Sequence, residues 1–297
     1  MGSDAGHVPV LLAEALELLA VRTGGLYVDG TVGLGGHAAA VLRASAPDGR
    51  LLGLDRDGET LEHAKARLAE FGGRVRLEKG DYREIPERLG SEKADGILLD
   101  LGISSAQLDD AGRGFSFQAE GPLDMRMDRS GGPTAADLVN RMRESDLARL
   151  LYDCGEEPAS RRIARAIVFA RERKPITSTT GLADIVRRAA PRRRPGGLHP
   201  ATRTFQALRI RVNRELEGLG EAFEGAARCL KPGGRLAVIA FHSLEDRAAK
   251  EAFRSLVTRG FRLLTKKPVR PGEAEVRANP RARSARLRAV QREEAAA

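Results

Sequence analysis

Several features are scarce in this chain of 297 residues, and each scarcity argues against a class of protein. Its two cysteines, Cys154 and Cys229, stand in unrelated contexts, which argues against a disulfide framework and a structural zinc site. Aromatic residues make up 4% of the chain and tryptophan is missing, so a stacking platform for single-stranded nucleic acid is not indicated. No apolar run approaches the roughly 18 residues of a membrane span, and no signal segment is recognisable. We therefore expect a cytoplasmic protein without a membrane partner.

Basic residues, by contrast, are abundant. The sequence has 50 lysines and arginines against 41 acidic residues, a formal net charge of +9 and a pI near 10.0. This balance fits a polyanionic partner, because cations that neutralise phosphates release condensed counterions. It equally fits an arginine-rich surface that contacts only water. Composition leaves both interpretations open.

Short apolar runs alternate with segments of helical spacing in the first third of the chain. The apolar runs are typical of buried strands, whereas leucines and alanines three and four positions apart are typical of helices. Their alternation predicts an α/β fold in which helices cover a parallel sheet. The expected strands are 26–29, 50–55, 75–77 and 94–100, and the expected helices are 38–42 and 61–68.

The pattern changes after residue 100. Residues 102–135 are rich in Gly, Asp and Ser, and a loop of that length is usually functional or disordered. Residues 136–190 show only helical spacing. The α/β pattern then resumes, with further strands expected at 235–241 and 262–264.

This order of patterns predicts one domain interrupted by another. We expect a core domain formed by residues 1–106 and 201–297, with a helical insert at 107–200. The segment 277–292 is interpreted as a basic tail that is partly low in complexity.

A glycine-rich turn joins the first expected strand to the first expected helix. Its sequence, Gly33-Leu34-Gly35-Gly36, lets a ligand approach the backbone closely and presents helix N-terminal amides to an anion. Asp55 ends the next strand, about 20 residues on, where a carboxylate can accept hydrogen bonds from both ribose hydroxyls. The combination fits two ligands, a dinucleotide or S-adenosylmethionine.

Three features favour S-adenosylmethionine. The loop lacks the third spaced glycine of the dinucleotide fingerprint. Asp81 and Tyr82 follow the third strand, where they can meet an adenine by a hydrogen bond and a ring contact. Asp100 ends the fourth strand, at the carboxyl edge where a doubly wound sheet binds its ligand. A nicotinamide (NAD)-dependent oxidoreductase stays open as an alternative, because the fold alone does not exclude it.

Longer motifs, which fall in order along nearly the whole chain, carry a more specific resemblance. They are HVPVLL at 7–12, YVDGTVGLGGH at 27–37, DLGISS at 100–105, QLDD at 107–110, RGFSF at 113–117, DMRMD at 124–128, HPATRTFQALR at 199–209 and FHSLEDR at 241–247. With these motifs the sequence resembles the bacterial 16S ribosomal RNA cytosine-N4 methyltransferases, the MraW or RsmH family. Cys154 departs from the family pattern, since an aromatic residue is expected there.

The resemblance implies a class I S-adenosylmethionine-dependent methyltransferase, with a Rossmann-like, mostly parallel sheet and an inserted all-helical domain for recognition of the RNA substrate. It also implies a pocket that contacts the methionine end, the ribose and the adenine of the cofactor. The implied contacts to the methionine end are Gly35, Gly36 and His37. Asp55 would hold the ribose and Tyr82 would lie on the adenine, and Asp100 with Gln107 would complete the pocket.

The implied activity is methylation of the exocyclic amine of one decoding-centre cytosine, at the P site of 16S ribosomal RNA. The implied partner is that RNA within the small ribosomal subunit, and a homodimer stays open. No His, Cys and Asp cluster has the spacing of metal ligands, so no metal is expected.

The catalytic candidates follow from the chemistry of this amine, whose lone pair is delocalised into the ring. Positioning and electrostatics should therefore carry most of the rate, and Asp100 is the best placed residue to orient the amine. Of the two histidines that could act as acid or base, we prefer His242 to His199, because His242 follows a strand of the cofactor sheet. Methylation at ring carbon C5 is disfavoured, because it needs a cysteine nucleophile and neither cysteine ends a catalytic strand.

Further expectations concern the RNA. The arginines at 192–194, Arg203 and those of the tail are expected to grip the phosphate backbone. The acidic and basic residues of 124–128 either order a lid over the base or form ion pairs within their loop. A non-catalytic assembly factor that only binds RNA stays as a second alternative, although the intact glycine loop, Asp55 and Asp100 argue against it.

Overall fold

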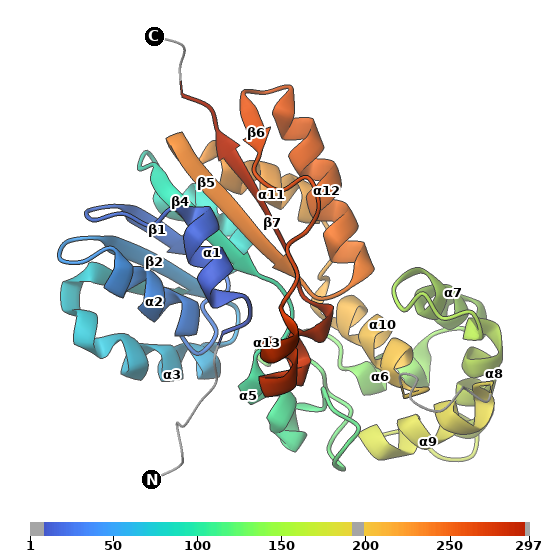
Figure 1. Cartoon of the computed structure of the whole chain (residues 1–297). Coiled ribbons are helices and arrows are strands. Elements are labelled where there is room, and N and C mark those ends of the chain that lie inside the picture. Colours follow the sequence, from blue (N-terminus) through green and yellow to red (C-terminus); the bar gives the residue numbers. More distant parts are fainter. Residues whose placement is uncertain (1–8, 192–198, 295–297) are drawn as a thin grey trace. The chain divides into compact units, whose positions relative to one another are not determined.

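The computed structural model describes residues 9–191 and 199–294 of the chain (Figure 1). Their contacts group them into two compact units. The sheet unit runs up to Gly102 and resumes at Gly218, whereas the helical unit is Ile103–Glu217. Each unit has its own hydrophobic core.

The second boundary differs from the one expected at residue 200. Helix α10 (Thr202–Asn213) packs against α7 (Glu144–Asp153) and α6 (Ala135–Arg141), so it belongs to the helical unit. Its buried residues, among them Phe205 and Leu208, join the core of that unit. Helical spacing alone does not show which of two cores a helix packs against, and this is why the sequence placed the boundary too early.

In the described residues, seven strands form one sheet with the order β3-β2-β1-β4-β5-β7-β6 (Figure 1). Strands β1 to β5 are parallel, and β7 is antiparallel to both of its neighbours. The mostly parallel sheet expected from the sequence is therefore confirmed. The strands are β1 (Leu26–Asp29), β2 (Arg50–Asp55), β3 (Val75–Lys79), β4 (Ala94–Asp100), β5 (Leu230–Ala240), β6 (Phe261–Leu263) and β7 (Arg286–Arg292).

Helices cover both faces of this sheet (Figure 1). The chain steps outward in one direction from β1 to β3 and in the other from β4 to β5, so right-handed crossovers place the two sets of helices on opposite faces. One set is α1 (Leu12–Leu19), α2 (Gly36–Ala44) and α3 (Gly58–Leu68). The other is α4 (Ile85–Leu89), α11 (Leu219–Arg228) and α12 (Ser243–Val257). Shorter pieces are η1 (Ala69–Arg74), η2 (Tyr82–Glu84), α13 (Glu273–Ala278) and η4 (Pro280–Ser284).

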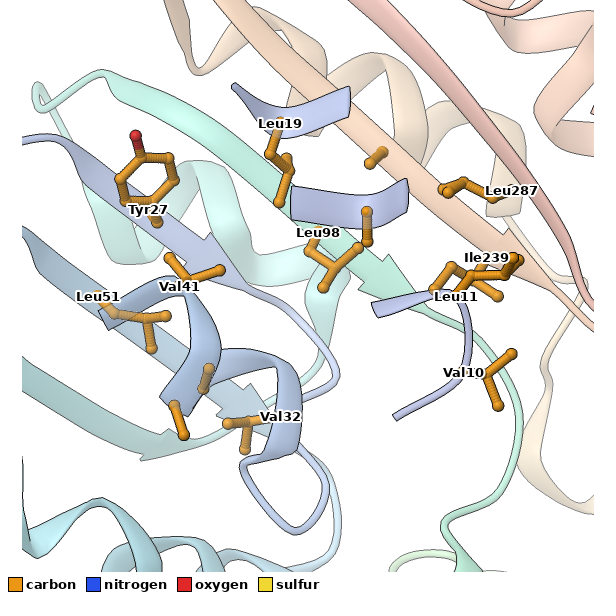
Figure 2. Packing of buried hydrophobic residues seen from close by; sticks show 14 of the residues in the cluster. Val10, Leu11, Leu19, Tyr27, Val32, Val41, Leu51, Leu98, Ile239 and Leu287 are labelled. Atoms are coloured by element: carbon orange, nitrogen blue, oxygen red, sulfur yellow. The ribbon is translucent and has the colours of Figure 1, made fainter. Parts of the chain in front are cut away.

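One core of the sheet unit lies between the strands and the helices of the first set (Figure 2). Leu11 and Leu98 are almost completely buried there, and burial contributes about 2 kcal/mol for each such leucine. Val32, which directly precedes the glycine-rich turn, packs into the same core. The turn that leads into α2 is thus anchored to the sheet by an apolar side chain.

The C-terminal segment corrects one expectation from the sequence. Residues 277–292, interpreted as a basic tail, contain the end of α13, η4 and strand β7. Strand β7 lies between β5 and β6, and Leu287 and Val290 are fully buried. Arginines stand between these apolar residues, so the segment was interpreted as a basic tail rather than as a half-buried strand.

The helical unit consists of short helices packed around a second core. Val139, Leu147 and Ile163 are fully buried there, and α8 contacts α6, α7 and α9. Its remaining elements are α5 (Ser105–Asp109), η3 (Ala111–Arg113), α8 (Ser160–Arg171) and α9 (Thr179–Ala189). None of the helices in residues 9–191 and 199–294 has both the length and the apolar character that a membrane span requires.

Candidate functional site

The glycine-rich turn between β1 and α2 depends on glycine at two positions. Gly35, the residue before α2, has φ +78°, a left-handed conformation that disfavours residues with a Cβ atom. A Cβ atom at Gly36 would lie 2.5 Å from Cγ of Pro9, which is closer than real contacts allow. The turn is therefore built for close backbone approach at the N-terminus of a helix of nine residues.

Asp55, at the end of β2, holds this turn against the sheet. Its carboxylate accepts the Gly33 amide at 2.8 Å and the Asp57 amide at 2.9 Å, one at each oxygen. Burial raises the pKa of Asp55 to about 6, although both hydrogen bonds favour the charged form. Each oxygen keeps acceptor capacity beyond its backbone bond, as a partner of two ribose hydroxyls requires.

A histidine and two carboxylates meet beside the turn. Nε2 of His37 lies 3.4 Å from Oδ2 of Asp100, which ends β4. Burial by itself would lower the pKa of His37, but the interaction with Asp100 and the charge of Asp29 together outweigh burial and raise that pKa. Asp29, which ends β1, is 3% exposed. Burial raises the pKa of Asp29 to about 7, and the charge of His37 opposes this increase.

Two atoms of this group are left without a full set of partners. Nε2 of His37 and Oδ1 of Asp100 are buried and make no hydrogen bond within the residues that the structure describes. The backbone around them is fixed, because the Asp100 amide donates to the Thr31 hydroxyl at 2.6 Å. A buried polar group without a partner costs about 1 to 3 kcal/mol, so a polar ligand at this edge would remove that cost.

Tyr82 begins η2, directly after β3, at the same edge of the sheet. Its ring is largely buried, and the guanidinium of Arg83 lies 4.8 Å from the ring centre. Asp81 caps η2 and forms ion pairs with Arg56 at 3.1 Å and with Arg83 at 2.9 Å. Its carboxylate thus already has cationic partners, whereas Tyr82 supplies an aromatic surface beside the strand end.

His242 follows β5 and is the N-cap of α12. Its Nδ1 atom accepts the Glu245 amide at 3.3 Å, and its Nε2 atom lies 3.2 Å from Oε1 of Glu245. Glu245 in turn accepts the Phe241 amide at 2.8 Å. Because Nδ1 acts as an acceptor, the proton of the neutral ring is on Nε2. The geometry therefore gives His242 a capping role, and acid or base catalysis by this ring stays a prediction.

The structure brings together most of the residues that the sequence singled out. Gly35, Gly36, His37, Asp55, Tyr82, Asp100 and His242 all lie at the carboxyl edge of the parallel strands in the sheet unit. Gln107 belongs to the helical unit, where it is buried and forms a reciprocal cap of α5 with Ser104. The arginines at 192–194 lie outside the described residues.

Sequence reasoning missed two residues of this edge, Asp29 and Thr31. Asp29 accepts the Thr31 amide at 3.1 Å, and the Thr31 hydroxyl reaches the backbone of β4. One signal was available, because Asp29 ends its strand just as Asp55 and Asp100 end theirs.

Other residues of the sequence motifs have structural partners in the helical unit. Asp124 pairs with Arg126 at 2.7 Å, as expected for an ion pair within the loop. Phe115 is buried in the core, and Phe117 stacks on His199 with ring centres 4.6 Å apart. These contacts account for the two aromatic rings as packing residues.

Comparisons with known proteins give one family match, several close relatives in sequence and distant structural neighbours. The family model described as the MraW methylase family matches residues 4–293. The chain is 52% identical to "Ribosomal RNA small subunit methyltransferase H" of Syntrophobacter fumaroxidans, over 98% of both chains. It is also 52% identical to the protein of that name from Symbiobacterium thermophilum, over 96% of both chains. A crystal structure of a SAM-dependent O-methyltransferase from Thermotoga maritima is 12% identical, with a TM-score of 0.44, and the match covers 96% of this chain and 66% of that chain.

Proposed function

We propose, because this chain belongs to the MraW methylase family, that it methylates the exocyclic N4 amine of a cytosine in 16S ribosomal RNA. Its relatives are named as small-subunit ribosomal RNA methyltransferases, and the proposed target is the cytosine at the decoding-centre P site. The substrate in this proposal is the RNA within the small ribosomal subunit, in the cytoplasm. The observation that carries the proposal is the pair of buried His37 and half-buried Asp100 beside the glycine-rich turn.

The cofactor of this methyltransferase is S-adenosylmethionine, which supplies an electrophilic methyl group when bound. The residues at the strand ends fit it. The helix N-terminal amides and the unsatisfied His37 nitrogen suit a carboxylate, and Asp55 suits a pair of hydroxyls. We assign Gly35, Gly36 and His37 to the methionine end, Asp55 to the ribose, Tyr82 to the adenine, and Asp100 with Gln107 to the rest of the pocket.

Asp100 has two tasks in the proposed reaction. Its Oδ2 atom faces His37, and its Oδ1 atom is a buried acceptor with no hydrogen bond in the described part of the chain. An N–H bond of the cytosine amine donated to Oδ1 would orient the nitrogen and draw its lone pair out of the ring. Holding the amine in line in this way lowers the barrier by positioning and electrostatics.

The two thiols favour amine chemistry over ring-carbon chemistry. Burial raises the pKa of Cys154, which packs against the core of the helical unit. Burial likewise raises the pKa of Cys229, whose Sγ atom donates to the Gly225 carbonyl. Neither sulfur is poised as the thiolate that would have to add to the ring for methylation at C5.

Membership of a methylase family favours this reaction over a nicotinamide-dependent oxidoreductase, the first alternative from the sequence. The test uses labelled S-adenosylmethionine and small subunits that lack the modification, followed by nucleoside analysis. We expect label in N4-methylcytidine. The Asp100→Asn variant should lose about 100-fold or more in rate, the usual effect of removing one preorganised polar contact to the reacting group. Asp48→Asn, which changes an exposed carboxylate of the same unit, should methylate normally.

Each other outcome changes the proposal in a defined way. Label in another nucleoside would keep the methyltransferase and overturn the cytosine amine as its target. An Asp100→Asn variant that folds and methylates at the wild-type rate would overturn the role of Asp100. RNA binding by the wild-type protein without any transfer would favour the second alternative, a non-catalytic assembly factor.

A further inference from the structure

A pocket of about 200 Å³ lies on the sheet unit between α12 and the strands β6 and β7. Phe253 and Leu263 contribute apolar surface, and Thr265 contributes a hydroxyl. Its volume is several times the ~30 Å³ that one water molecule occupies, enough for a phosphate and part of a sugar. The other lining residues are all cationic: Lys250, Arg254, Lys266 and Arg288.

Three of these cations have no acidic partner in the described residues. Lys250 and Arg254 are exposed, one turn apart on α12, and Lys266 is exposed just after β6. Nearby like charges repel, and on a helix such pairs are destabilising. A group of unpaired cations around a concave surface is the electrostatic arrangement that binds a phosphate.

Arg288 differs from these three because it is held in place. It is 7% exposed, and Asp246 accepts its Nε atom at 2.6 Å and its Nη2 atom at 3.3 Å. Asp246 also accepts Nη1 of Arg286 at 3.4 Å. Within the described chain, Nη1 of Arg288 makes no hydrogen bond, so the guanidinium keeps donors for a ligand.

Thr265 adds a neutral donor beside these cations. It is largely buried, and its Oγ1 atom accepts the Ala289 amide at 3.0 Å. An oxygen that accepts a backbone N–H still carries its own proton, which it can donate to a phosphate oxygen. The pocket therefore offers point charges, an oriented guanidinium and a hydroxyl over an apolar floor.

The pocket is separate from the strand ends that carry the candidate active site. It lies at the β7 and β6 end of the strand order, whereas the glycine-rich turn and Asp55 lie at β1 and β2. Helix α12 connects the two regions, because it begins after the cap His242, and the rise from there to Lys250 is about 12 Å. A strand of RNA that presents one base at the sheet edge could place a neighbouring phosphate over this pocket.

We propose that this pocket binds the phosphate backbone of the substrate RNA, away from the nucleotide that is methylated. The proposal rests on RNA being the substrate, and it assigns the pocket a role in affinity rather than in chemistry. Residues of the pocket should therefore change KM and leave kcat unchanged.

The test compares two double variants that remove the same charge. Lys250→Gln with Arg254→Gln removes two unpaired cations of the pocket. The control, Arg43→Gln with Lys65→Gln, removes two exposed cations that already pair with Glu70 and Glu62. We expect KM for small subunits to rise about tenfold in the pocket variant, with an unchanged kcat and unchanged S-adenosylmethionine affinity. The dependence of log KM on log salt should weaken by about 1 to 2, as expected when one or two phosphate contacts are lost.

Binding of free 16S ribosomal RNA, measured without methyl transfer, separates the outcomes. Unchanged affinity and salt dependence in a folded pocket variant would overturn the phosphate site and leave the proposed reaction intact. Weaker RNA binding in the pocket variant, with no methylation by the wild-type protein, would support the pocket and overturn the reaction. A loss seen with whole subunits but not with free RNA would overturn the RNA assignment in favour of an acidic protein surface.

Discussion

The carboxyl ends of the strands in the sheet unit and the loops and caps of the helical unit shift the pKa values of their aspartates in opposite directions. At the strand ends of the sheet unit, burial raises the pKa of Asp29 to about 7 and that of Asp55 to about 6. In the helical unit, burial also acts to raise the pKa of Asp124, but the hydrogen bonds and charge of Arg126, together with the charge of Arg129, outweigh burial and lower that pKa. Hydrogen bonds from Thr134 lower the pKa of Asp137.

This difference separates residues that cost stability from residues that contribute to it. A carboxyl with a raised pKa destabilises the folded state when it ionises, whereas one with a lowered pKa stabilises the folded state in its charged form. The first kind is concentrated where the glycine-rich turn meets the sheet, and the second kind fixes loops and caps. A cluster of carboxyl groups that destabilise the fold when they ionise is typical of a functional site.

The sharpest test of this contrast is the pH dependence of Asp29→Asn. Below about pH 3 the carboxyl is mostly protonated in both folded and unfolded states, so Asp29 does not lower the free energy of unfolding. Between about pH 4 and 7 only the unfolded state ionises, and stability falls by a total on the order of 4 kcal/mol. Asparagine removes this loss, so the variant should be more stable than wild type at pH 8 and nearly equal to it at pH 3. Hydrogen exchange of peptides from β1 and β4 measures the effect.

Neighbouring charges define the control for this experiment. The charges of Asp100 and Asp55 raise the pKa of Asp29, and the charge of His37 lowers it. Asp48→Asn, at an exposed position of the same unit, should keep the wild-type pH profile. An Asp29→Asn profile that falls as steeply as wild type would show that another carboxyl carries the dependence.

A smaller loss is expected when a satisfied polar group is removed from the helical unit. Asn213 is 4% exposed; its amide nitrogen donates to the Met125 and Arg209 carbonyls at 2.7 and 2.9 Å, and its oxygen accepts the Met127 amide at 2.7 Å. Asn213→Ala leaves these backbone groups buried and should destabilise the unit by about 3 kcal/mol. Hydrogen exchange in α6, α7 and α10 measures it.

Asn140→Ala provides the comparison within the same unit. Asn140 also bonds backbone groups, with its amide donating to the Ile176 carbonyl at 2.8 Å, but it is only partly buried. Water can replace some of its bonds, so its loss should be smaller, about 1 kcal/mol. Equal losses at both positions would mean that burial does not decide the cost.

A further prediction, of a smaller effect than those at Asp29 and Asn213, concerns the turn itself. Gly35→Ala places a Cβ atom at φ +78° and 3.2 Å from Leu68, which should cost about 1 to 2 kcal/mol. Gly220→Ala, inside α11 with open space around its Cβ position, should instead stabilise by about 0.5 to 1 kcal/mol. Thermal unfolding of both variants checks the opposite signs. A stable Gly35→Ala variant would show that the turn accepts another conformation.

The sequence predicted the sheet well where strands are fully buried. Strands β1, β2 and β4 appear at the expected residues. Strands of a parallel sheet are buried on both faces, so they appear in the sequence as short continuous apolar runs. Strand β7 was missed because it lies at the junction of parallel and antiparallel pairing and alternates apolar residues with arginines. Its partner strands β5 and β6 are far away in the sequence, so the residues of β7 alone do not indicate which strands it pairs with.

From local patterns alone, the sequence predicted only site residues that stand at or shortly after the ends of expected strands. Asp55 and Asp100 follow from their positions after buried runs, and Asp29 could have been found by the same rule. The capping role of His242 depends on where α12 begins, and the pair of Asp100 with His37 depends on the spacing of β1 and β4. Contacts across a sheet are set by packing rather than by neighbours in sequence, which is why these were not foreseen.

The position of β7 has a consequence for how the protein is made. Strand β7 follows both β5 and β6 in the chain and emerges after them during synthesis, yet it fills the place between them. Until it arrives, the backbone groups of β5 along that side are an open edge that can pair with other chains. A nascent chain that stops at residue 285 therefore leaves β6 (Phe261–Leu263) with no strand beside it. Translation must reach β7 before the sheet can close, so ribosomes that terminate early release chains prone to aggregation rather than partly active enzyme.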